Sequence, residues 1–110
     1  MKTATKSDSW TRDEIRDTVQ ILASLANPVR MAAFALAADG HETVESIRAA
    51  VEERIGESVS QPTASRAVNW LAMAGLLYGS RQGKGVAYSP TPKGVRLLAM
   101  LARLRAEGGQ

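Results

Sequence analysis

Signals that begin a helix occur at five places in this sequence and divide most of its length into short helical segments. A Ser, Thr or Asn side chain before a helix accepts a hydrogen bond from the first turn, and Pro is tolerated at the first helical positions. The five signals are Thr11 with Glu14, Asn27-Pro28, Thr43, Ser60 with Pro62, and Thr91-Pro92. A chain of 110 residues with five such signals predicts one mainly helical domain.

Apolar residues recur at helical spacing behind these signals. The segment 28–39 is apolar on most of its sides, so we expect it to lie in the core, with Gly40 ending it. Alanine, valine and leucine residues recur on one side of the segment 61–74, and short polar or basic residues recur on the other. We therefore expect one face of this helix to be buried and the other to be exposed.

The segment 77–89 lacks this helical pattern and is predicted to form a β-hairpin. Gly83-Lys84-Gly85 lies at its centre, and glycine permits the positive backbone angles of a tight turn, which places Lys84 at the tip. The expected fold is mainly α with a small β-hairpin: four helices, the two-stranded hairpin and a last helix, within a domain spanning 10–107. Residues 1–9 are almost entirely polar, and we predict a mobile N-terminal arm there.

The distribution of charge is more informative than the net charge of +3. The first 57 residues carry ten acidic and seven basic side chains, whereas 58–106 contain no Asp or Glu and seven basic residues. The basic residues of the second half are Arg66, Arg81, Lys84, Lys93, Arg96, Arg103 and Arg105. A half without carboxylates offers a polyanion a surface without local repulsion.

Two helices joined by a turn and followed by a basic hairpin have a shape that fits duplex DNA. The major groove admits one helix, and there Gln or Asn bonds adenine while Arg bonds guanine. We predict that helix 61–74 enters the major groove and that hairpin 77–89 contacts the flanking backbone or the minor groove. The candidate DNA-binding residues are Ser60, Gln61, Thr63, Ser65, Arg66, Asn69, Arg81 and Lys84. The alternative is a module of the same shape for protein–protein contacts, which the absence of carboxylates from both elements disfavours.

The first and last predicted helices carry more apolar surface than a core of this size needs. The residues of the predicted dimer interface are Ile15, Val19, Leu22, Leu97, Leu101 and Leu104. A two-fold dimer would place its two recognition helices about 34 Å apart, one turn of DNA, and predicts an inverted-repeat binding site.

Three segments resemble the ArsR-type transcriptional repressors. The stretch 22–31, Leu-Ala-Ser-Leu-Ala-Asn-Pro-Val-Arg-Met, is similar to their opening motif, and 60–71, Ser-Gln-Pro-Thr-Ala-Ser-Arg-Ala-Val-Asn-Trp-Leu, is similar to their recognition helix. Ala74-Gly75-Leu76-Leu77 and the basic hairpin ending in Val86-Ala87-Tyr88 resemble their helix exit and wing. The resemblance implies a winged helix-turn-helix fold and a homodimer, joined through the first and last helices, that blocks an operator.

The sequence departs from the ArsR pattern in three respects. The connection from 44 to 60 is several residues longer than the compact motif, so 52–58 either lengthens a helix or forms a loop. Thr91-Pro92-Lys93-Gly94 resembles the segment after the wing in MarR-type and PadR-type regulators, which leaves the subfamily open. The chain has no cysteine, and 92–106 has no His, Asp or Glu, so metal sensing is not expected.

Other classes of function lack the residues they need. With no cysteine and a single histidine, His41, neither a catalytic triad nor a transition-metal site is indicated, and no phosphate-binding glycine motif is present. We expect no enzyme, no cofactor and no metal, and no small-molecule effector is identified. No apolar run approaches about 20 residues and no signal-peptide pattern is present, so we expect a cytoplasmic protein without a membrane partner. We interpret Trp70, Met73 and Met100 as core or subunit-interface residues, and His41 as capping or solvated.

Overall fold

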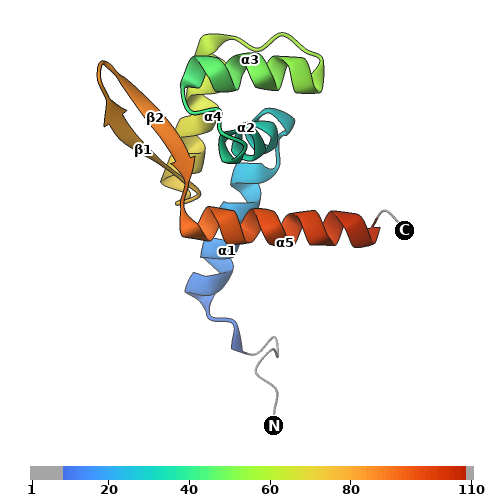
Figure 1. The fold of residues 1–110 in the computed structure, drawn as a ribbon. Helices are drawn as coiled ribbons and strands as arrows, with labels where there is room; N and C mark the ends of the chain where they lie inside the picture. Colours follow the sequence, from blue (N-terminus) through green and yellow to red (C-terminus); the bar gives the residue numbers. More distant parts are fainter. Residues whose placement is uncertain (1–8, 109–110) are drawn as a thin grey trace.

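The computed structural model describes residues 9–108 and shows a mainly helical fold with one hairpin (Figure 1). Over these residues the elements are α1 (Arg12–Leu25), α2 (Pro28–Ala38), α3 (Val44–Ile55), α4 (Gln61–Met73), β1 (Leu77–Gln82), β2 (Gly85–Pro90) and α5 (Pro92–Gly108). The predicted fold class, five helices with a two-stranded wing, is confirmed. The predicted arm, 1–9, lies outside the described residues except for Ser9.

All five predicted caps form. The Thr11 hydroxyl accepts a hydrogen bond from the backbone N–H of Glu14 (3.1 Å), whose carboxylate accepts one from the N–H of Thr11 (2.8 Å). Side-chain oxygens begin the other four helices in the same way, accepting from the N–H three residues on: Asn27 before α2, Thr43 before α3, Ser60 before α4 and Thr91 before α5. Each cap satisfies a donor that a helix leaves free, and its removal costs about 1 kcal/mol.

The core lies where α2, α3 and α4 meet. Phe34 of α2, Ile47 of α3 and Leu71 of α4 are fully buried and belong to one apolar cluster. The cluster also includes Leu76 and Leu77, which follow α4 in the sequence. Burial of each such side chain contributes about 1.5–3 kcal/mol. The prediction that the segment 28–39 sits in the core is confirmed, because four residues of α2 are buried.

The connection from α3 to α4 resolves the first departure from the ArsR pattern. Both alternatives hold in part: 52–55 continue α3 to Ile55, where Gly56 ends the helix with a φ of 75°, and 56–58 belong to the loop. Glycine suits this left-handed conformation because it has no Cβ atom. A short connection then leads through Val59, which is buried, to the Ser60 cap.

The start of α5 packs against the end of α4. The Thr91 hydroxyl donates to the carbonyl of Gly75 (2.7 Å), and the Thr91 N–H donates to that of Leu76 (3.0 Å). A Cβ atom on Gly94 would overlap the Leu76 carbonyl oxygen and lie 3.2 Å from the Phe34 ring. The glycine of the Thr91-Pro92-Lys93-Gly94 motif therefore allows this close approach.

The hairpin pairs in antiparallel register from Leu77 with Pro90 to Gln82 with Gly85. Its turn contains two residues, Gly83 and Lys84, because Gly85 is the first residue of β2; the sequence had indicated a turn of three. At the base of the hairpin, the N–H of Tyr88 donates to the carbonyl of Glu42 (2.8 Å). This bond attaches the hairpin to the connection between α2 and α3.

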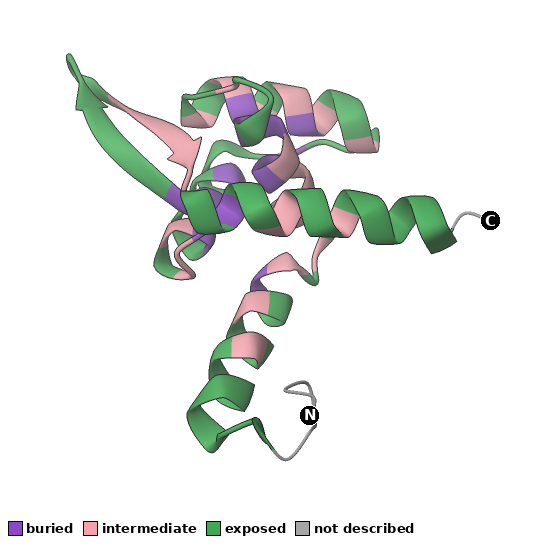
Figure 2. Cartoon of the chain, turned by 60° about the horizontal axis from the view of Figure 1, so that its bottom comes forward, coloured by how far each residue is buried: buried purple, intermediate pink, exposed green. Residues whose placement is uncertain are grey.

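α1 and α5 project from this core (Figures 1 and 2). Ser24 is the only buried residue of α1 and Gly94 the only buried residue of α5, counted over the described chain. The radius of gyration is 15.6 Å, whereas a compact domain of this length has about 13 Å. The protomer thus leaves much of two helices without a packing partner of its own.

Candidate nucleic-acid interface

The exposed face of α4 is short, polar and basic. Gln61, Ser65, Arg66 and Asn69 are exposed, while Ala64, Ala67, Val68 and Leu71 are buried on the other side of the helix. The two faces that the spacing predicted are therefore present. α4 contains no carboxylate, so its surface does not repel a phosphate backbone.

Ser60 and Thr63 also form the hydrogen bonds that begin α4. The Ser60 hydroxyl accepts from the backbone N–H of Thr63 (3.2 Å) and donates to the Thr63 hydroxyl (2.9 Å). Thr63 is half-buried, unlike Ser65 and Arg66. These two predicted contact residues thus stabilise the first turn of α4.

The hairpin holds the other two candidate residues away from α4. Arg81 pairs with Val86 next to the turn, Lys84 lies in the turn itself, and both side chains are exposed. Figure 1 shows the hairpin rising beside α4 and extending past the body of the protein. The predicted residues therefore form two groups: one face of α4, and the far end of the hairpin.

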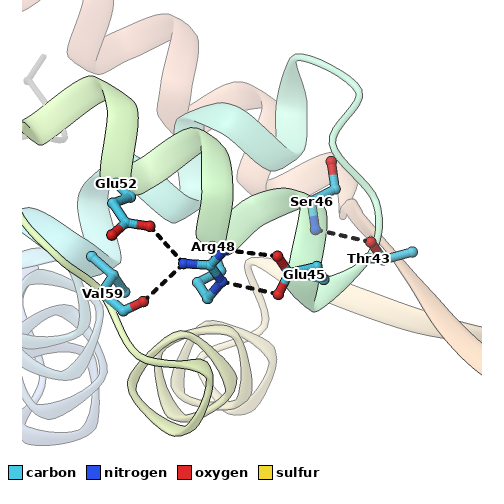
Figure 3. Close-up of polar contacts among 6 residues, drawn as sticks. All are labelled: Thr43, Glu45, Ser46, Arg48, Glu52 and Val59. Atoms are coloured by element: carbon cyan, nitrogen blue, oxygen red, sulfur yellow. Dashed lines mark hydrogen bonds and ion pairs between the residues drawn. The ribbon is translucent and has the colours of Figure 1, made fainter.

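Arg48 holds the chain directly before α4 in place, a role that was not predicted from the sequence (Figure 3). Its guanidinium donates two hydrogen bonds to the carboxylate of Glu45 (2.7 and 2.9 Å), one to Glu52 (2.6 Å) and one to the carbonyl oxygen of Val59 (3.1 Å). The hydrogen bond from Arg48 lowers the pKa of Glu45, and the carboxylates of Glu45 and then Glu52 raise the pKa of Arg48. The signal was present as the spacing of Glu45, Arg48 and Glu52 on one helix face.

Arg30 and Trp70 form a second contact that the sequence analysis missed. The guanidinium carbon of Arg30 lies 4.6 Å from the centre of the Trp70 ring, within the range of cation–π attraction. Trp70 is 44% exposed, so the interpretation of this residue as part of the protomer core is wrong. Met73 and Met100 are likewise exposed rather than in the core, so for all three residues the subunit-interface interpretation stays a prediction.

The predicted dimer residues form uncovered apolar surface on α1 and α5. Ile15, Val19, Leu22 and Leu104 are more than half exposed. Leu97 and Leu101 are half-buried, and Leu97 packs against the core of the protomer. The apolar face of α5 is thus shared between the core and the surface.

Metal and membrane features are limited over residues 9–108. No group of three or more His, Asp or Glu residues there is arranged to hold a metal ion. The Nδ1 atom of His41 is 2.8 Å from the Ser46 hydroxyl, so this half-buried histidine is hydrogen-bonded to α3. No single helix in the described part of the chain is long and apolar enough to span a membrane; α1 and α2 together pass on length and composition but are bent by 90° at their junction.

The arrangement of helices and hairpin is similar to that of known structures. No family model and no curated protein matches the sequence. Among solved structures, the homodimeric winged helix-turn-helix DNA-binding domain of Mb0332 from Mycobacterium bovis, a possible ArsR-family transcriptional regulator, matches with a TM-score of 0.76 and 26% identity over 96% of this chain and 93% of that one.

Two further structures agree. The transcriptional repressor BigR from Xylella fastidiosa has a TM-score of 0.62 and 25% identity over 86% of this chain and 95% of its own. HlyU from Vibrio cholerae has a TM-score of 0.67 and 21% identity over 86% and 97%. The Mb0332 domain, a possible regulator, and the repressor BigR are transcriptional regulators rather than enzymes. The resemblance carried by the sequence motifs is confirmed: the chain has a winged helix-turn-helix fold, and its structure is similar to that of a possible ArsR-family regulator.

Proposed function

We propose that the chain, through its 10–107 domain, is a homodimeric transcriptional repressor that binds an inverted-repeat operator in double-stranded DNA. The observation that carries this proposal is the face of α4. A helix that buries one side in the core presents on its other side Gln61, Ser65, Arg66 and Asn69, without a carboxylate. A regulator bound to chromosomal DNA acts in the cytoplasm.

Each predicted contact residue has a role that its chemistry suits. Gln61 and Asn69 suit adenine, and Arg66 suits guanine, because these side chains bond the base edges with two hydrogen bonds in the major groove. Ser60, Thr63 and Ser65 suit phosphate oxygens or single contacts to bases. Arg81 and Lys84, at the far end of the hairpin, suit the flanking backbone or the minor groove.

The dimer follows from the uncovered helices. Leu22 and Leu104 remain exposed on α1 and α5, and a second copy would remove this apolar surface from water. The Mb0332 domain, similar to this chain over nearly its whole length, is homodimeric. Two-fold symmetry would present two copies of α4 to successive major grooves, which matches an inverted repeat. The similarity to the repressor BigR supports the repressing role.

Selection from a random duplex library tests this proposal without knowledge of the operator. We expect enrichment of an inverted repeat with half-site centres about 10 base pairs apart. Fluorescence anisotropy should then show tight binding to that site, weaker binding to a scrambled duplex, and a steep loss of affinity as salt rises. The absence of any enriched site, with weak binding even at low salt, would favour the module for protein–protein contacts instead.

The repressing role needs its own measurement. In a reporter strain with the selected site between promoter and gene, expression of the protein should lower reporter output. An increase in output would show that the protein activates transcription. A duplex with one half-site inverted is the control, because it keeps the base composition and removes the two-fold symmetry.

A further inference from the structure

We infer that Arg30 is a positioning residue that couples the dimerisation helix α1 to the recognition helix α4, and so sets the separation of the two recognition helices in the dimer. This inference rests on the proposed function. One guanidinium group contacts the carboxyl end of α1 and the Trp70 ring of α4. The residue itself lies in the first turn of α2, where its N–H donates to the Asn27 cap.

The contact with α1 is made to two carbonyl oxygens of its last turn, of which that of Ala23 also accepts from the N–H of Ala26 (3.2 Å). The last carbonyl groups of a helix lack the usual partner four residues on and carry partial negative charge. Arg30 donates from Nε to the carbonyl oxygen of Ser24 (2.7 Å) and from Nη2 to that of Ala23 (3.0 Å). The last turn of α1 contains no basic residue of its own, so α2 supplies the cation.

The contact with α4 uses the same planar group. The Arg30 guanidinium carbon lies 4.6 Å from the centre of the Trp70 ring, and Trp is the aromatic residue that attracts cations most strongly. Trp70 follows the exposed Asn69 on the helix that we propose reads DNA. A movement of α1 relative to α2 therefore displaces a group that also contacts the recognition helix.

α1 has few other attachments that could fix its angle. Ser24 is its only buried residue in the described chain. Between α1 and α4, next to Trp70, lies an open groove of about 580 Å³, lined by Gln20, Ala23, Ser24, Trp70, Met73 and Ala74. The two helices are therefore not held together by close packing along this groove. In a two-fold dimer joined through α1, a change of its angle would act on both copies of α4.

Lysine cannot replace arginine in this arrangement. The two hydrogen bonds and the ring contact all use one flat, forked guanidinium group, whereas a lysine ammonium is a point charge. Arg30→Lys keeps the charge and Arg30→Met removes it, so the pair separates geometry from charge. Trp70→Leu removes the ring and leaves the carbonyl contacts. Arg54→Met is the matched control, because Arg54 is exposed between Glu53 and Glu57, on α3 and outside both contact groups.

The first readout measures separation in the dimer without DNA. The chain has no cysteine, so Ser65→Cys introduces one spin label per protomer on α4. Double electron–electron resonance should give one narrow distance distribution for otherwise unchanged protein and for Arg54→Met. We expect a broadened or shifted distribution for Arg30→Met, Arg30→Lys and Trp70→Leu, with circular dichroism confirming that each is folded. The same narrow distribution in all folded variants, or no intersubunit distance at all, would overturn the inference.

The second readout uses the selected inverted repeat with its half-site spacing changed by one base pair in either direction. Arg30→Met should bind the preferred spacing about 2- to 30-fold more weakly, the range over which residues that couple two sites act. It should also discriminate less between spacings than Arg54→Met does. Unaltered discrimination in a folded Arg30→Met protein would refute the inference while leaving the proposed function intact. If the unsubstituted protein binds no DNA, the proposed function fails instead, and the distance measurement still decides whether Arg30 couples the helices.

Discussion

Arg48 donates a hydrogen bond to the carbonyl oxygen of Val59 (3.1 Å), the residue directly before the Ser60 cap of α4. The remaining hydrogen bonds of its guanidinium go to Glu45 and Glu52 of the same helix. Two carboxylates thus offset its charge. Arg48 lies near the start of α4, but its guanidinium positions the chain rather than being free to bind a phosphate.

The first prediction follows from this distinction. Arg48→Met frees the turn before α4, so affinity for the operator should fall. Because the charge of Arg48 is already offset, the dependence of log affinity on log salt should stay the same. Anisotropy titrations at several salt concentrations measure both quantities, with Arg54→Met as a control for loss of one charge. A slope reduced by about 0.9 would mean that Arg48 contacts a phosphate after all.

The second prediction concerns pH. The hydrogen bond from Arg48 lowers the pKa of Glu45 below its ordinary value of 4.5. A carboxyl group whose pKa is lower in the folded state stabilises that state above its unfolded pKa, and this contribution disappears as pH falls through the folded pKa. Glu45→Gln should therefore be less stable than the unsubstituted protein near neutral pH.

The difference in stability should shrink as the pH falls below 4.5, and it should be small because the pair is partly exposed. Urea denaturation across this pH range measures it. Glu53→Gln, at an exposed carboxylate of the same helix, is the control for a general effect of charge. A difference that stays constant into acid would show that the ionised pair contributes nothing.

The third prediction concerns Gly94, where α5 lies against the backbone of Leu76. Alanine is a better helix former than glycine by about 0.8–1.0 kcal/mol, so propensity alone favours Gly94→Ala. A Cβ atom there would overlap the backbone carbonyl of Leu76, and such overpacking typically costs about 1–3 kcal/mol. We expect a net loss of stability in urea denaturation at matched protein concentration. Gly108→Ala, in open space on the same helix, should not destabilise the protein; equal behaviour of both would contradict the packing argument.

Local signals explain how much of this fold could be predicted. A helix cap joins residues only three positions apart, and a tight turn involves only a few residues. The helices and the hairpin could therefore be predicted from the sequence. The contacts of Arg30 and Arg48 were not, because they join segments whose approach depends on tertiary packing. Val59 is eleven residues after Arg48 in the sequence, and the whole of α3 separates Arg30 on α2 from Trp70 on α4. For the same reason the sequence could not show that Trp70 lies at the surface.

The fourth prediction tests the apolar surface on α1. Val19→Asp places a charge on the proposed interface, and burial of an unpaired carboxylate is costly. The mass measured by light scattering should shift from dimer to monomer. Val19 is already exposed in the protomer, so helical content by circular dichroism should be retained. Arg16→Gln makes the same change of charge at an exposed site one turn away and should remain dimeric. A dimeric Val19→Asp protein would place the interface elsewhere.

The fifth prediction separates base reading from backbone binding. Arg66 is exposed on the polar face of α4, and Lys84 lies in the turn of the hairpin. Arg66→Ala should cost about 1–3 kcal/mol on the selected site and little on random DNA, because it removes the proposed contact to a base edge. Lys84→Ala should weaken binding to both duplexes and reduce the salt slope by about 1, because it removes the proposed phosphate contact. Anisotropy with both duplexes at several salt concentrations distinguishes the two effects. If the two variants lose affinity for specific and random DNA in the same proportion, α4 and the hairpin do not divide recognition in this way.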